Sequence, residues 1–135
     1  MRDFERIKNY NKINIQALGR LSGLSSVRMT SIIYDNRTHP DRHELIAIKK
    51  SIQTLRIEAV QILSLFSQNR VTEIALTKLK DFLSRGEIKQ NCLFESKKTG
   101  KDVNDWMLGK RTYIPATDEE ILWALQTFVT ETTML

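Results

Sequence analysis

Apolar side chains recur at every third or fourth position through most of this chain, which is the spacing that places them on one face of an α-helix. The longest series steps from Leu45 to Phe66, and a second runs from Ile74 to Leu83. No segment alternates apolar and polar residues around an Asn-Gly or Asp-Gly turn, as a β-hairpin would. The pattern therefore predicts an all-α protein.

Glycine, proline and capping residues set the boundaries of the predicted helices. Between Asp41 and Arg85 there is neither glycine nor proline, which favours long helices over a flexible linker. We predict one break in this stretch, at Ser51–Thr54, and a last helix that begins at the Thr-x-x-Glu capping box of Thr117. Helices are expected over residues 2–11, 14–22, 25–34, 41–53, 54–68, 71–85, 88–97, 100–108 and 118–131.

Two of the short helices are spaced as a helix-turn-helix, in the stretch NIQALGRLSGLSSVRMTSIIYDNR. Asn14 can cap the first helix and Ser25 the second. Between them, Gly23 allows the positive φ of a tight turn. Gly19 stands one helical turn earlier, where two crossing helices would come closest. This order of caps and glycines is the layout of a helix-turn-helix.

The stretch resembles the lambda repressor/Cro-type (XRE-like) helix-turn-helix DNA-binding family. The resemblance covers roughly residues 2–68, with IQALGRLSGLSS as the first motif helix and turn. VRMTSIIYDNRTHP corresponds to the recognition helix and exit loop, and ELIAIKKSI to a following core helix. The family often opens its first motif helix with glutamine, whereas here Ile15 holds that position and Gln16 follows.

The second half of the chain repeats the pattern of the first. A shift of 74 residues places Gln16 on Gln90, Leu18 on Cys92, Met29 on Val103, Ile32 on Trp106 and Arg37 on Arg111. With one inserted residue, Pro40 falls on Pro115 and Ile46 on Ile121. The segments VNDWMLGKRTYIP and EEILWAL also resemble the family. We therefore expect two tandem helix-turn-helix units, residues 1–68 and 69–135, packed through the central helices. Lys97 stands where the second turn would need glycine, and Gly100 follows three residues later.

The resemblance implies which residues contact DNA. In the first unit, the recognition helix 25–34 would meet the major groove and flanking residues the phosphates, with contacts from Gln16, Ser25, Ser26, Val27, Arg28, Ser31 and Arg37. In the second unit, helix 100–108 would be the equivalent, with contacts from Gln90, Lys98, Thr99, Lys101, Asn104, Lys110 and Arg111.

The chemistry of the first recognition helix suits base edges in several ways. Arg28 could bond two guanine acceptors at once or contact a phosphate, and Val27 could meet a thymine methyl group. A solvated helix face with two capping serines is the alternative for the same residues. In the second helix, Asp102 and Asp105 would repel phosphate, so packing or self-association is the alternative there.

Charge is distributed unevenly along the 135 residues. The whole chain carries a formal net charge of +5. Residues 1–70 hold twelve Lys or Arg against six Asp or Glu, whereas residues 71–135 hold nine against ten. The first half is therefore the better candidate for a phosphate-facing surface.

Other compositional features narrow the function classes. The single cysteine, Cys92, cannot form an internal disulfide, which fits a reducing cytosol. No apolar run is long enough to span a membrane, and neither a glycine-rich phosphate loop nor a pair of catalytic carboxylates is present. We therefore expect a cytoplasmic protein, of bacterial or phage origin, that is not an enzyme and that has no cofactor, metal or membrane contact.

Together these features favour a sequence-specific regulator that binds double-stranded DNA, acting as a repressor by occupying its site. The alternative is a protein-interaction module or inhibitor, such as a phage or mobile element encodes, that uses the helix-turn-helix fold as a dimerisation or partner-binding surface. The near-neutral second half would then contact a second copy of the chain or another protein.

Overall fold

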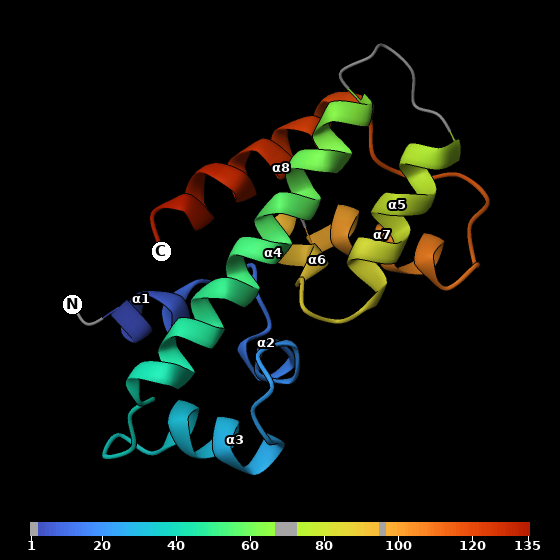
Figure 1. Ribbon diagram of the computed structural model, residues 1–135. Helices are drawn as coiled ribbons and strands as arrows, with labels where there is room; N and C mark the ends of the chain where they lie inside the picture. Colours follow the sequence, from blue (N-terminus) through green and yellow to red (C-terminus); the bar gives the residue numbers. More distant parts are fainter. Residues whose placement is uncertain (1–2, 67–72, 95–96) are drawn as a thin grey trace.

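The computed structural model describes residues 3–66, 73–94 and 97–135, with the backbone alone for residues 97, 98 and 100. Over these ranges the chain is all-α, as predicted, and its only β pairing is an isolated antiparallel bridge between Ile13 and Ile88. Figure 1 shows the helices, which are α1 Asp3–Asn9, α2 Ile15–Leu21, α3 Ser26–Tyr34, α4 Arg42–Phe66, α5 Glu73–Ser84, α6 Gln90–Leu93, α7 Lys97–Met107 and α8 Asp118–Thr133.

The α2–α3 pair follows the local chemistry of its sequence. The side chain of Asn14 accepts a hydrogen bond from the backbone N–H of Ala17, which caps α2, and Ser25 caps α3 in the same way. Gly23, in the turn, has a φ of +80°. A β-carbon on Gly19 would lie 2.0 Å from Cγ of Met29, so only glycine lets α2 and α3 cross this closely. The predicted caps and the predicted close approach are confirmed.

The predicted break at Ser51–Thr54 is wrong, because α4 is one helix of 25 residues. The hydroxyl of Ser51 donates to the carbonyl of Ala47, and that of Thr54 to Lys50, so both polar side chains are satisfied within the helix. The buried stripe also continues through the predicted break, since Leu55 is as fully buried as the residues before it. Burial along one face therefore outweighs the local preference for a turn.

The second half departs from its predicted boundaries. α6 has only 4 residues and ends at Leu93, although a helix over 88–97 was expected. α7 begins at Lys97, three residues before the predicted start, so Gly100 lies within the helix instead of preceding it. The side chain of Leu93 is fully buried and that of Cys92 only half-buried. The buried counterpart of Leu18 is thus Leu93, one residue later than the sequence comparison placed it.

One apolar core runs through both halves of the described chain. Leu55, Ile62 and Phe66 of α4 and Leu79 and Phe82 of α5 are buried in it, as the packing of the central helices predicts. However, α4 makes its most extensive contact with α8 and a smaller one with α5 (Figure 1). The expected boundary between units, at residues 68 and 69, lies outside the described residues.

Among the helices in the described ranges, none combines the length and the apolar character needed to cross a bilayer.

Candidate nucleic-acid interface

The exposed surface of α3 is a strip of four side chains, Ser26, Val27, Thr30 and Tyr34, which we call the α3 outer face. Val27 is 78% exposed and Tyr34 77%. Met29, Ile32 and Ile33 on the opposite side are buried, so the helix cannot rotate without exposing them. The sequence predicted Ser26 and Val27 at this surface but missed Thr30. Helical spacing from Val27 would have found it, because residues three and seven positions on share a face.

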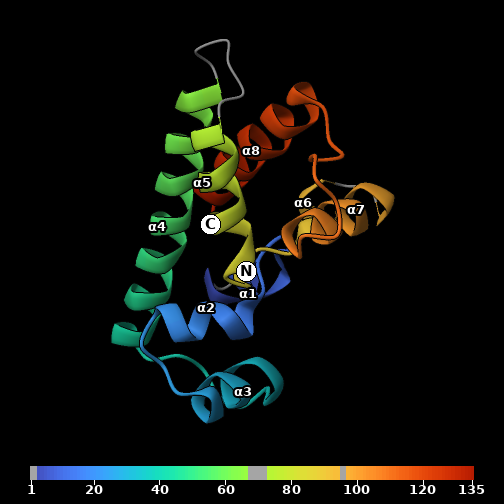
Figure 2. The ribbon, with the colours of Figure 1, turned by 90° about the vertical axis from the view of Figure 1, so that its right-hand side faces the viewer.

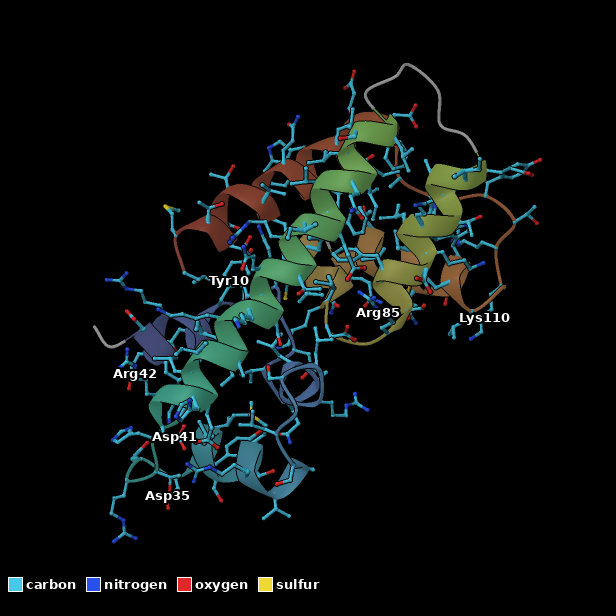
Figure 3. All side chains as sticks on the ribbon, in the orientation of Figure 1. Tyr10, Asp35, Asp41, Arg42, Arg85 and Lys110 are labelled. Carbon is cyan, nitrogen blue, oxygen red and sulfur yellow. The ribbon has the colours of Figure 1, made fainter. Side chains whose placement is uncertain are left out.

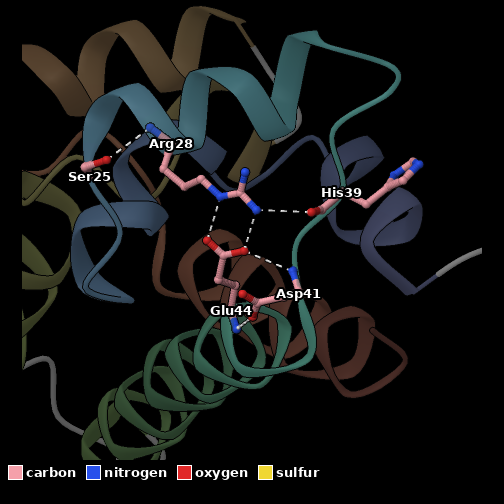
Figure 4. Close-up of polar contacts among 5 residues, drawn as sticks. All are labelled: Ser25, Arg28, His39, Asp41 and Glu44. Atoms are coloured by element: carbon pink, nitrogen blue, oxygen red, sulfur yellow. Dashed lines mark hydrogen bonds and ion pairs between the residues drawn. The ribbon is translucent and has the colours of Figure 1, made fainter.

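Arg28 is held within the protein. Its Nε donates to Oε2 of Glu44 at 2.7 Å and its Nη2 to Oε1 at 2.8 Å, while Nη2 also donates to the carbonyl oxygen of His39 at 3.3 Å (Figure 4). This guanidinium edge is the kind that would read a guanine, and it is occupied by a carboxylate instead. The structure therefore assigns Arg28 the role of fixing α3 against the start of α4.

Glu44 also completes a capping box at the N-terminus of α4. Its Oε1 accepts a hydrogen bond from the backbone N–H of Asp41 at 2.9 Å, and Oδ1 of Asp41 accepts one from the N–H of Glu44 at 2.8 Å. The hydrogen bonds from Arg28 are the largest cause that lowers the pKa of Glu44 to about 2. The pattern Asp-x-x-Glu in DRHE is the signal from which this cap could have been predicted.

Other predicted contact residues of the first unit surround the α3 outer face. Gln16 donates from Nε2 to the carbonyl oxygen of Ser26 at 3.2 Å, so it links the N-terminal ends of α2 and α3. It lines a hollow of about 430 Å³ together with Arg20, whose side chain is exposed. Ser25 is exposed at the cap, whereas Ser31 is only half-exposed.

Basic side chains lie next to the α3 outer face rather than on it. The side chain of Arg37 is 96% exposed in the loop that follows α3, and its Nε lies 3.9 Å from Oδ1 of Asp35. Arg42, at the start of α4, is exposed as well. With Arg20, these side chains place three accessible cations around an uncharged helix face. Such an arrangement can attract a polyanion at the edges while polar and methyl groups meet its centre.

The exposed surface of α7 has the same spacing as that of α3. Lys101, Asn104 and Leu108 are exposed, and we call this strip the α7 outer face. Val103 and Trp106 are buried beneath it. The similarity supports Lys101 and Asn104 as surface candidates of the second half.

Three other predicted residues of the second half have different surroundings. Gln90 is half-buried and donates from Nε2 to the carbonyl oxygen of Leu83 at 3.3 Å, so it does not face outward as a phosphate contact would. Nη2 of Arg111 lies 3.1 Å from Oδ1 of Asp102, which neutralises part of its charge. Thr99 is half-buried, Lys110 is exposed in the loop after α7, and the side chain of residue 98 lies outside the described part (Figure 3).

Within the described ranges, no three His, Cys, Asp or Glu side chains come together in a way that could hold a metal ion. The chain matches no protein-family model, no curated protein and no solved structure. The geometry of the α3 outer face and its cationic border therefore carries the functional argument.

Proposed function

We propose that this protein is a sequence-specific regulator that binds double-stranded DNA and reads the major groove with α3. The observation that carries the proposal is the construction of this helix. α3 is capped by Ser25, crosses α2 at a glycine, is pinned to α4 through Arg28 and leaves four small or polar side chains exposed. A rigid helix with a narrow exposed ridge fits the major groove, which is about 12 Å wide.

The side chains of the α3 outer face suit recognition of bases. The hydroxyl groups of Ser26 and Thr30 can each donate to or accept from a base edge, and the methyl groups of Val27 can contact the C5-methyl group of thymine. Affinity would come from the border, where Arg20, Arg37 and Arg42 can approach phosphates. Specificity and affinity are thus assigned to different residues.

The resemblance of residues 2–68 to lambda repressor/Cro-type domains supports the same function. It also suggests the manner of regulation, since a protein that occupies its site excludes other proteins from that stretch of DNA. A repressor acting in the cytoplasm of a bacterium, encoded there or by a phage, fits this reading. Arg28 contributes by positioning α3, not by reading a base as the sequence suggested.

A second candidate function is binding to another protein through the same surfaces. Several large apolar or aromatic side chains are exposed near the two outer faces, namely Val27, Tyr34, Leu108 and Tyr113. Such side chains are common at protein interfaces. The outer faces would then contact a partner, and binding would depend little on salt.

Binding to a duplex selected from random DNA distinguishes the two functions. With about six phosphate contacts, affinity should fall about 10³-fold between 50 and 200 mM salt. Replacing the contacted thymines by uracil, which lacks the methyl group, should weaken the wild type but not Val27→Ala. Thr130→Ala, an exposed substitution on α8, is the control and should behave as the wild type. The absence of binding to any duplex at low salt would exclude the DNA function.

A further inference from the structure

We propose that one chain reads two inverted half-sites of unlike sequence, the first with α3 and the second with α7. The inference rests on the proposed function and specifies its DNA target. Its basis is that the two halves of the chain contact each other reciprocally, as the subunits of a two-fold symmetric dimer do.

The clearest reciprocity lies at the bridge between Ile13 and Ile88. The backbone N–H of Asn14 donates to the carbonyl oxygen of Glu87 at 2.8 Å, and that of Lys89 donates to Lys12 at 3.0 Å. Adding 75 to the residue numbers converts the first pair of positions into the second, with donor and acceptor halves exchanged. Equivalent residues that face each other in this way lie on a two-fold axis.

Side chains on either side of the bridge repeat the exchange. The hydroxyl of Tyr10 donates to Glu131 on α8 at 3.0 Å. Arg85, at the position 75 residues later, bonds to Glu58 on α4 at 2.9 Å. Each residue thus reaches from its own half to a glutamate on the long helix of the other half; Figure 3 labels Tyr10 and Arg85.

The long helices α4 and α8 complete the symmetric arrangement. Each begins with a capping box, that of α8 being formed by Thr117 and Glu120. The two boxes are 76 residues apart, and the same offset relates Arg56 to Thr132, whose carbonyl oxygen accepts a hydrogen bond from Nη1 of Arg56 at 3.0 Å. The α4–α8 contact, the most extensive between any two helices described, therefore includes a pair of equivalent positions.

The axis fixes the relation between the two outer faces. Val27, Thr30 and Tyr34 of α3 have the same spacing as Lys101, Asn104 and Leu108 of α7, and both strips are exposed. In Figure 2, α3 lies at the bottom of the molecule and α7 at its right, with the N-terminal loop that pairs with residues 87–89 between them. Helices related by a two-fold axis run in opposite directions along a duplex, so the half-sites they read are inverted.

The chemistry of the two outer faces differs, so the half-sites must differ too. The α3 outer face offers methyl and hydroxyl groups and no charge, which favours thymine. On the α7 outer face, the amide of Asn104 can bond N6 and N7 of adenine, and the ammonium group of Lys101 can bond O6 and N7 of guanine. A symmetric homodimer would read two identical half-sites, whereas this chain can read an asymmetric site without dimerising.

The experiment measures stoichiometry and footprint on a duplex selected from random DNA by the full chain. We expect one molecule per duplex and two protected major-groove segments, with centres about 10 base pairs apart. Thr30→Ala should relax base preference in one segment only, and Asn104→Ala in the other, each weakening binding by about tenfold. Both residues are exposed, and an unchanged thermal midpoint would show that each variant is folded.

The alternative outcomes separate this inference from the proposed function. A single protected segment whose binding is indifferent to Asn104→Ala would overturn the inference and leave α3 as a DNA reader. Two molecules on a palindromic site would overturn it as well. Failure to bind any duplex would remove the proposed function and the inference together.

Discussion

In the first half of the chain, α3 is fixed by backbone geometry and an ion pair, whereas α7 in the second half is fixed mainly by apolar packing. Gly19 and Gly23 bring α3 close to α2, and the Arg28–Glu44 pair ties it to α4. α7 instead buries Val103 and the ring of Trp106, with Nζ of Lys80 lying 5.2 Å from the ring centroid.

The difference shows that one arrangement of helices can be reached by two kinds of local chemistry. The position of Arg28 in α3 corresponds to that of Asp102 in α7, and each makes an ion pair, with the signs reversed. Since the outer faces keep the same spacing, the two halves can diverge beneath them without moving what they present.

The largest expected effect tests the packing of α7. Trp106 is 6% exposed, and its truncation leaves a cavity under the α7 outer face. We expect Trp106→Ala to lower the free energy of unfolding by about 3–5 kcal/mol, measured by chemical denaturation. A loss below about 1 kcal/mol, typical of surface substitutions, would show that the ring is not part of the core and that α7 is held differently.

The next effect tests the close crossing of α2 and α3. In Gly19→Ala the new methyl group meets Met29, and neither helix can move away without disturbing the core. We expect a loss of about 1–3 kcal/mol by the same measurement, and no comparable loss in Thr130→Ala. A neutral Gly19→Ala would mean that the helices are further apart than the structure has them.

A smaller effect concerns acid. Because the pKa of Glu44 is lowered from 4.5 to about 2 in the folded protein, its ion pair stabilises the fold above pH 4.5. This contribution is lost as the pH falls from 4.5 towards 2, where the carboxylate becomes protonated. In Glu44→Gln the thermal midpoint should fall less steeply over this interval than in the wild type. Identical pH profiles would indicate that the pair with Arg28 does not form in solution.

Local features of the fold were predictable because their chemistry lies within a few residues. Asn14, Ser25 and Thr117 cap helices in the structure as their sequences indicate. The break at Ser51–Thr54 was predicted wrongly, because the decisive force is burial against α2 and α8, which local polarity does not reveal.

The candidate site was predictable only in part for a similar reason. The exposure of Val27, Lys101 and Asn104 follows from helical spacing. The partner of Arg28 does not, because Glu44 is sixteen residues away and meets it only after α4 has folded against α3. Gln90 was placed on the surface by comparison with Gln16, although the short α6 turns its amide towards Leu83.

The most direct test of the central claim, that the α3 outer face reads DNA, is to repeat the selection from random duplexes with the double variant Val27→Ala/Thr30→Ala. Both side chains are exposed, so the variant should retain the fold of the wild type. We predict that the wild type selects a defined sequence and that the double variant loses preference at the positions α3 contacts. Selection of the same sequence by both proteins would contradict the account.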